Sequence, residues 1–324
     1  MQEVSLFFQE MMYLCAPCSC GTNVRIQFGR YEREMRQGRE SIYMRSAGFR
    51  MKRFYVGHDR SSMRVGTDGV LLGAWCPPVV RQCSCMGESE GRLCTHEDRV
   101  GGCRPLRVLD VGTGCGLIAL MLAQRIEEKL SEMAVSYEGA DGQQCGWKVD
   151  GIDIDEESER QAAENFVCSP WSEHLRACQG DVRTWEMEVG GDNGVYNLVV
   201  SNPPFYNDAL ACPNERRARA RQAGLSLGFE ELTAAAARLL VRDGMFGVIV
   251  PASEEERMVR AALASGLYVS KRCVVYTKQG GAAHRVMMAF EKESRGVQEM
   301  QMVLSEPGKV RSEAYQQLTE AFYL

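Results

Sequence analysis

VLDVGTGCGLIALMLAQR, from Val108 to Arg125, is the stretch that decides the predicted fold. A short apolar strand, Arg107 to Asp110, leads through three closely spaced glycines into an apolar helix from Leu117 to about Leu130. This is the opening unit of a doubly wound α/β sheet. The glycines follow an aspartate with the spacing G-x-G-x-G, whereas dinucleotide sites use G-x-G-x-x-G, so the pattern argues against NAD.

The same turn suits S-adenosylmethionine as a cofactor. This molecule carries no phosphate, and glycines would let the backbone approach its adenosyl and amino-acid parts. The alternative is a tight strand-to-helix turn without a ligand. Asp153 ends the predicted strand Trp147 to Asp153 and fits a ribose diol, because one carboxylate accepts from two hydroxyls. Asp181, after the strand Arg176 to Gln179, fits the adenine amino group, whereas Asp155 is explained by helix capping.

Residues for the chemical step follow another predicted strand, Tyr196 to Ser201. Their types fit methylation of an exocyclic amine on a planar ring, such as N6 of adenine. The side-chain carbonyl of Asn202 and the backbone carbonyl of Pro203 could accept both N–H groups of that amine. Consecutive prolines hold the loop rigid, and Phe205 offers a face on which a base can stack. The predicted catalytic residues are therefore Asn202, Pro203, Pro204 and Phe205; the alternative is an ordinary Asn-Pro turn.

The remaining pattern completes the fold prediction. A helix is expected near Leu227 to Val241 with Gly244 as its terminator, followed by a strand from Met245 to Val250. Two late strands, Tyr268 to Tyr276 and Arg285 to Glu291, form an antiparallel pair. The fold class is thus α/β, a doubly wound, mostly parallel seven-stranded sheet with an antiparallel edge.

Composition sets the class of protein. The chain has 324 residues and a formal net charge of −5, without an apolar run long enough to span a membrane. The N-terminus lacks the positive start of a secretory signal, and the 14 cysteines suit a reducing compartment, so we expect a cytoplasmic monomer. Several cysteines are expected to be small buried apolar residues, namely Cys115, Cys168, Cys178 and Cys273.

No metal is predicted, although a zinc site is an open alternative. Its candidate ligands do not repeat a C-x-x-C pair; they are Cys15, Cys18, Cys20, Cys83, Cys85, Cys94, His96 and Cys103. Residues 1–45 are expected to form a poorly ordered extension, and residues 46–324 a methyltransferase domain with insertions near 80–104 and 129–146. Met44 and Met51 leave a later translation start as an open alternative.

Basic residues mark the expected substrate surface, with a solvated face as the alternative. The predicted substrate-binding residues are Arg216, Arg217, Arg219, Arg221, His284 and Arg285. The glycine-flanked Thr67 and Asp68 form either a turn or a loop over the methionine end of the cofactor. The predicted cofactor-binding residues are Asp110, Gly112, Gly114, Gly116, Asp153, Asp181, Thr67 and Asp68.

Roughly residues 49–324 resemble the bacterial methyltransferases that modify N6 of the adenine at position 37 in the anticodon loop of a valine tRNA. The segments that carry this resemblance are Val56–Trp75, Val108–Arg125, Ile152–Phe166, Val199–Tyr206, His284–Phe290 and Ser312–Leu324. The resemblance implies S-adenosylmethionine as cofactor and tRNA as partner. It places Gly112, Gly114, Gly116, Asp153 and Asp181 at cofactor positions and Asn202 to Phe205 at the target amine. The N-terminal extension and the two insertions depart from the family's pattern.

Three other functions are weighed against this one. A glutamine N5-methyltransferase acting on a protein would use the same loop, but the Arg-rich stretch beside Asn202 and the missing peptide-binding helical domain argue against it. A DNA adenine N6-methyltransferase would have to flip its base, and no added recognition domain is seen. An inactive RNA-binding module would be expected to show a broken glycine turn or a replaced Asn202.

Overall fold

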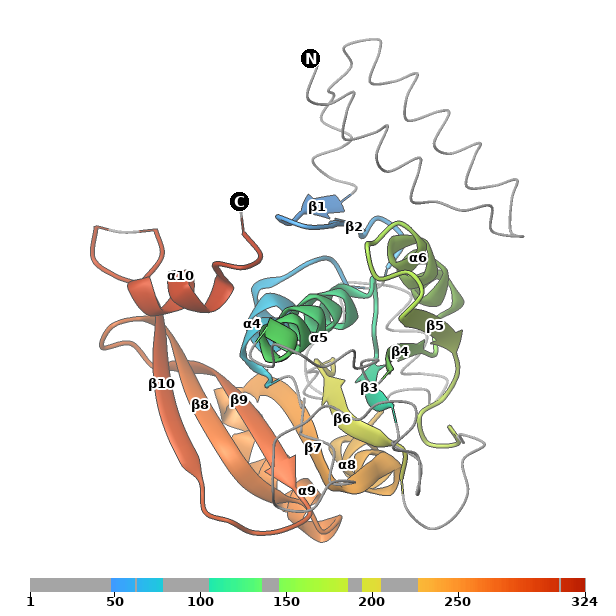
Figure 1. Cartoon of the computed structure of the whole chain (residues 1–324). Coiled ribbons are helices and arrows are strands. Elements are labelled where there is room, and N and C mark those ends of the chain that lie inside the picture. The colour runs from blue at the N-terminus through green and yellow to red at the C-terminus, as the bar shows by residue number, and fades with distance from the viewer. Residues whose placement is uncertain are drawn as a thin grey trace. The chain divides into compact units, whose positions relative to one another are not determined.

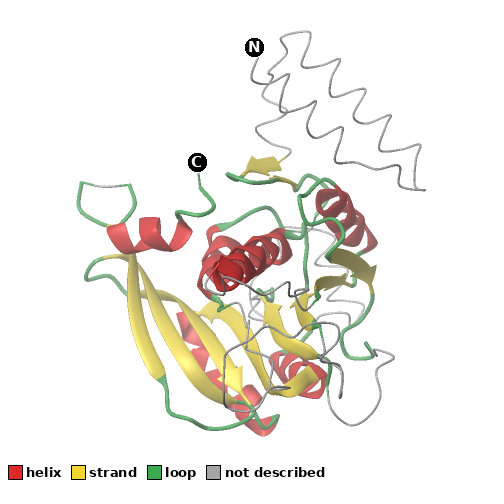
Figure 2. Cartoon of the chain, viewed as in Figure 1, coloured by secondary structure: helices red, strands yellow, loops and turns green. Residues whose placement is uncertain are grey.

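The computed structural model describes residues 48–61, 63–77, 105–135, 146–185, 194–204, 227–308 and 310–323. Its main feature is an eight-stranded sheet in the order β10-β8-β9-β7-β6-β3-β4-β5 (Figures 1 and 2). The strands are β3 (Leu106–Val111), β4 (Trp147–Asp153), β5 (Leu175–Gln179), β6 (Tyr196–Ser201), β7 (Leu240–Pro251), β8 (Tyr268–Lys278), β9 (Ala283–Glu291) and β10 (Gln298–Ser305). A separate antiparallel pair joins β1 (Gly48–Arg50) to β2 (Tyr55–Gly57).

Strand directions confirm the predicted fold class. From β5 through β4, β3 and β6 to β7 every neighbouring pair is parallel, whereas β9 runs antiparallel to both β7 and β8. The sheet has one strand more than the seven expected, because β10 pairs with β8 in parallel. Met300, Met302 and Leu304 of β10 pack against the core, a period-two pattern that the sequence reading passed over.

Helices cover both faces of the sheet, which explains why the central strands are mostly buried on both sides. On one face lie α4 (Thr67–Trp75), α5 (Leu117–Val135), α6 (Glu156–Val167) and α10 (Glu313–Thr319). On the other lie α8 (Phe229–Leu239) and α9 (Glu255–Ala264), the latter preceded by the short 3-10 helix Ala252–Glu254. Alternate residues of β3 divide between these layers, since Val108 joins the α5 side and Leu109 the α8 side.

Some predicted boundaries were wrong. Helix α5 continues to Val135, into residues expected to begin an insertion. Gly244 does not terminate a helix; it lies within β7, which starts at Leu240 and pairs with β6 at Tyr196. A Cβ on Gly244 would lie 3.0 Å from the Tyr196 carbonyl oxygen, so close strand approach explains the glycine.

Four cysteines were expected to be buried. Cys115 and Cys273 are buried, Cys178 is half-buried, and Cys168 is exposed. The prediction is wrong for Cys168, which lies beyond the last residue of α6, at the C-cap position, and is exposed there. The cysteines and the histidine of the alternative zinc site all lie outside the described residues.

In the described part of the chain, no helix is both long enough and apolar enough to cross a membrane.

The carboxyl ends of the parallel strands form one edge of the sheet. Along this edge β5, β4, β3, β6 and β7 follow in spatial order, and β9 begins beside the end of β7, where Arg285 pairs with Pro251. Because β3 and β6 are neighbours, the glycine turn after β3 and Asn202 after β6 lie next to each other at this edge.

Candidate functional site

The glycine turn folds over the end of β4. Gly112, Gly114 and Gly116 have φ angles of 70°, 57° and 80°, in the left-handed region that favours glycine. The backbone N–H groups of Gly112 and Thr113 donate to the Ile152 carbonyl at 2.9 and 3.0 Å. The turn therefore brings the start of α5 close to the last residues of β4.

Asp110, at the end of β3, is fully buried below this turn. Its Oδ2 accepts from the Thr113 hydroxyl at 2.8 Å and from the backbone N–H of Ala119 in α5 at 3.3 Å. Burial raises the pKa of Asp110 to about 7, an effect that these hydrogen bonds only partly oppose. The other carboxylate oxygen, Oδ1, is buried and has no hydrogen-bond partner among the described residues.

Asp153, at the end of β4, has backbone partners on both oxygens. Gly114 N–H donates to Oδ2 at 2.9 Å, and Asp155 N–H donates to Oδ1 at 3.0 Å. Burial raises the pKa of this carboxyl as well. Each oxygen keeps a second acceptor position, so the carboxylate can serve two adjacent hydroxyls. Asp155 caps α6 as predicted, because its side chain accepts from Ser158 N–H at 3.0 Å.

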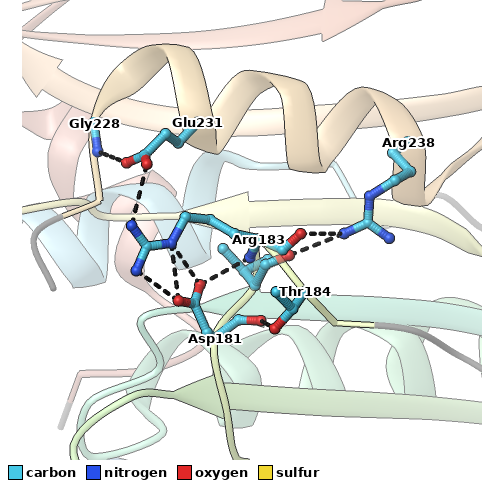
Figure 3. A network of polar contacts seen from close by, with 7 residues as sticks. Asp181, Arg183, Thr184, Gly228, Glu231 and Arg238 are labelled. Carbon is cyan, nitrogen blue, oxygen red and sulfur yellow. Dashed lines mark hydrogen bonds and ion pairs between the residues drawn. The ribbon is translucent and has the colours of Figure 1, made fainter.

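Asp181 follows β5 and is engaged by its neighbour Arg183 (Figure 3). The carboxylate accepts from the Arg183 backbone N–H at 2.9 Å and from guanidinium Nη2 at 2.6 Å, while Nε lies 2.9 Å from both oxygens. This hydrogen-bonded guanidinium holds the pKa of Asp181 below its usual value. The side chain remains 27% exposed, so a ligand can reach it.

Asn202 follows β6 at the centre of the edge. The Ser201 hydroxyl donates to the Val111 carbonyl at 2.9 Å and so ties the end of β6 to the end of β3. The side-chain oxygen of Asn202 is buried, and no described residue donates to it. Pro203 is buried and Pro204 is exposed. A buried acceptor without a donor is costly in a protein interior, unless a ligand supplies the donor.

The segment between β2 and α4 lies against the glycine turn. Asn165 of α6 bridges the two: its amide accepts from Gly57 N–H at 2.9 Å and donates to the carbonyls of Gly57 and Cys115 at 2.8 and 2.7 Å. Gln161, one turn earlier, accepts from Arg60 N–H at 2.9 Å. Sequence reasoning missed both residues, although buried polar side chains spaced i, i+4 on an amphipathic helix were a usable signal.

Asp68 and Arg285, which the sequence analysis assigns to cofactor and to substrate, form an ion pair. Arg285 Nε lies 2.9 Å from Asp68 Oδ2, and both side chains are half-buried. The pair joins the first turn of α4 to the start of β9, at the same edge of the sheet as Asn202. Thr67 and His284 are exposed. Five predicted site residues lie outside the described residues, namely Phe205, Arg216, Arg217, Arg219 and Arg221.

Comparison with known proteins identifies the family. Over 281 residues the chain is 35% identical to a tRNA1(Val) (adenine(37)-N6)-methyltransferase from Enterobacter sp., covering 87% of this chain and 96% of the relative. A protein of the same name from Phocaeicola vulgatus is 34% identical, and the alignment covers 85% of this chain and 97% of the relative. The chain belongs to the tRNA1(Val) (adenine(37)-N6)-methyltransferase family. No model of a protein family matches it.

A solved structure supports the fold of this family member. A predicted O-methyltransferase from Agrobacterium tumefaciens aligns with a TM-score of 0.50 at 16% identity, covering 79% of this chain and 96% of the other. At such low sequence identity, the alignment supports the fold and carries no information about function. The arrangement of strands at the carboxyl edge is thus that of a methyltransferase sheet, and the polar residues along it are candidates for its ligands.

Gly116→Ala is expected to destabilise the methyltransferase by about 2 to 3 kcal/mol, because it combines a strained φ angle with overpacking. A Cβ at Gly116 would lie 2.5 Å from Phe166 Cε1 in the core. Gly112→Ala is the matched control, since its φ is also positive but nothing lies within 4 Å of its Cβ; a loss of about 1 kcal/mol is expected there. Urea denaturation of both variants measures the difference, and equal losses would contradict the crowding at Phe166.

Proposed function

We propose that the protein transfers a methyl group from S-adenosylmethionine to N6 of adenine 37 in the anticodon loop of tRNA1(Val). The observation that carries the proposal is the buried, unpartnered side-chain oxygen of Asn202, placed beside the glycine turn in a chain related over most of its length to enzymes named for this reaction. An exocyclic amine supplies the N–H donor that this oxygen lacks among the described residues.

The order of the acidic residues supports S-adenosylmethionine as the cofactor. Along the edge, Asp181 follows β5, Asp153 ends β4, Asp110 lies in β3 and Asn202 follows β6. We assign these positions to the adenine amine, the ribose hydroxyls, the amino-acid end and the target amine. The hydrogen-bond acceptors at the edge support this assignment. Oδ1 of Asp110 has no donor among the described residues, and the ammonium group at the amino-acid end of the cofactor would provide one.

The residues proposed at the target amine bind the adenine and orient its N6 amine. The Asn202 side-chain oxygen and the Pro203 carbonyl would accept the two N–H groups of N6 and direct its lone pair toward the methyl donor. When bound, S-adenosylmethionine supplies an electrophilic methyl group. Because the two prolines hold φ near one value, the backbone that carries the Pro203 carbonyl has little freedom to rotate. Phe205 is proposed to stack on the adenine.

The anticodon loop would be held mainly through its phosphates. We assign this contact to the exposed His284 beside the Asp68–Arg285 pair and to the arginines at 216, 217, 219 and 221. This assignment is supported by the strand order, because β7 and β9 lie on the other side of β6 from the strands that carry the acidic residues. Arg285 then holds α4 in place through its ion pair with Asp68.

The test is methyl transfer from radiolabelled S-adenosylmethionine to total tRNA that lacks this modification, followed by nucleoside analysis. N6-methyladenosine at position 37 of tRNA1(Val) is the expected product. Parallel reactions contain duplex DNA or a protein extract as the acceptor. Label in either of these without label in tRNA would overturn the proposed substrate and leave an amino-methyltransferase of another specificity.

Cofactor affinity is expected to fall as the pH drops below about 7. Burial raises the pKa of Asp110 to about 7, so below that pH the free protein must lose a proton before Oδ1 can accept from the cofactor's ammonium group. The dissociation constant of S-adenosylhomocysteine should rise about tenfold per pH unit between 7 and 5. Calorimetric titrations of the wild type and Asp110→Asn check this, and an unchanged slope in the variant would refute it.

A further inference from the structure

Three carboxylates at the carboxyl edge of the sheet are assigned to the cofactor, and Asp181 is held differently from Asp110 and Asp153. Asp110 and Asp153 are buried, and backbone N–H groups contribute to holding both. Asp181 is 27% exposed, and most of its hydrogen bonds come from one side chain, the guanidinium of Arg183. The position of its oxygens therefore depends on what holds Arg183.

Arg183 is itself held by α8, which packs in the same hydrophobic cluster as Val182 and Trp185 (Figure 3). Its Nη1 donates to Glu231 Oε1 at 3.1 Å, and Glu231 Oε2 accepts from the backbone N–H of Gly228 at 2.9 Å, at the start of α8. Near the other end of α8, Arg238 donates to the carbonyls of Val182 and Trp185 at 3.0 and 2.8 Å. Helix α8 thus holds both the backbone of this turn and the guanidinium that orients Asp181.

The count of acceptor positions limits what Asp181 can bind. A carboxylate offers about four lone-pair positions. Three N–H groups of Arg183 make four contacts to it: the backbone N–H reaches Oδ1, Nη2 reaches Oδ2, and Nε is shared between both oxygens at 2.9 Å. Three donors for four positions leave room for at most one further hydrogen bond. A vicinal diol would need two, whereas an amino group that presents one N–H needs one.

We propose that Arg183, braced by Glu231 of α8, is a positioning residue that holds the Asp181 carboxylate to accept a single hydrogen bond from the exocyclic amine of the cofactor's adenine. The inference rests on the proposed function. It extends that function because α8 would influence recognition of the cofactor's adenine through Arg183, although α8 supplies none of the acidic residues at the carboxyl edge. The Arg183 guanidinium also keeps the carboxylate ionised, which strengthens the hydrogen bond it accepts.

The experiment compares two ligands by calorimetry: S-adenosylhomocysteine and its analogue with hydrogen in place of the adenine 6-amino group. The wild type is expected to bind the parent about ten- to a hundredfold more tightly, as a hydrogen bond to a charged group predicts. Arg183→Met should lower affinity for the parent alone, so that the ratio falls toward one. Glu231→Gln should lower the ratio partly, and Arg183→Lys should restore little of it, since lysine lacks the planar fork.

Arg272→Met is the matched control. Arg272 is as exposed as Arg183, at 28%, and its guanidinium forms two hydrogen bonds to Glu255. It lies in β8, which five strands separate from β5 in the sheet. Its substitution should leave the ligand ratio unchanged. Thermal melts of all variants establish that they are folded. If Arg183→Met does not fold, Glu231→Gln tests the same contact between Arg183 and α8.

Three results would overturn the inference: a wild type that does not discriminate the two ligands, an Arg183→Met variant that keeps the wild-type ratio, or one that loses affinity for both ligands equally. A further readout is the methylation rate at saturating cofactor, which should change little in Arg183→Met while KM for the cofactor rises. Discrimination between the ligands without any tRNA methylation would count against the proposed substrate alone, so the two failures are distinguishable.

Discussion

Asn202→Ala is expected to lower the rate of methyl transfer to tRNA by about 10²- to 10³-fold, the range found when one preorganised polar group is removed from an active site. The side-chain oxygen is buried and lacks a donor in the described structure, so its proposed partner is the target amine. Cofactor affinity should stay within about twofold, because none of the acidic residues at the cofactor positions changes. Single-turnover methylation and calorimetry measure the two quantities.

The same strand offers a matched control. Asn197 lies at the opposite end of β6, where its side-chain oxygen accepts from the backbone N–H of Arg107 at 2.9 Å. Asn197→Ala removes the same group from a structural contact and should lower stability without a comparable loss of single-turnover rate. If Asn202→Ala and Asn197→Ala slow the reaction equally, Asn202 acts through the fold and not as an acceptor for the amine.

The buried strands at the centre of the sheet are what the sequence predicts best. Trp147–Asp153 and Tyr196–Ser201 were predicted with their observed bounds, because each ends at a polar residue that leads into a turn or loop. The second is an apolar run apart from Asn197, whereas Lys148 and Asp150 interrupt the first. The glycines at 112, 114 and 116 were singled out for their spacing, and all three have positive φ. Local chemistry dictates these features, so the sequence is sufficient to find them.

Contacts between distant segments could not be predicted in the same way. Asn165 joins Gly57 across 108 residues, and Asp68 meets Arg285 across 217. Neither partner carries a local signal of the other, because the pairings follow from the order of strands and helices in space. The Arg183–Glu231 contact is of this kind too, since it depends on α8 beginning beside the turn after β5.

Asp153→Ala is expected to weaken binding of S-adenosylhomocysteine by about 10²- to 10⁴-fold. Two hydrogen bonds from ribose hydroxyls to one carboxylate are each worth about 1.5 to 3 kcal/mol, and both are lost. The control is Asp155→Ala, two residues further on. Asp155 caps α6 through Ser158 N–H, so its loss should cost about 1 kcal/mol of stability and leave the hydroxyl contacts in place.

Because Asp153 also accepts from Gly114 N–H, a loss of affinity alone could come from a displaced turn. A ligand that lacks one hydroxyl separates the two causes. The 2′-deoxy form of S-adenosylhomocysteine should bind the wild type at least tenfold more weakly than the parent, and Asp153→Ala should bind both forms with similar affinity. If the variant still prefers the hydroxylated ligand by the wild-type factor, Asp153 supports the glycine turn and another residue binds the ribose.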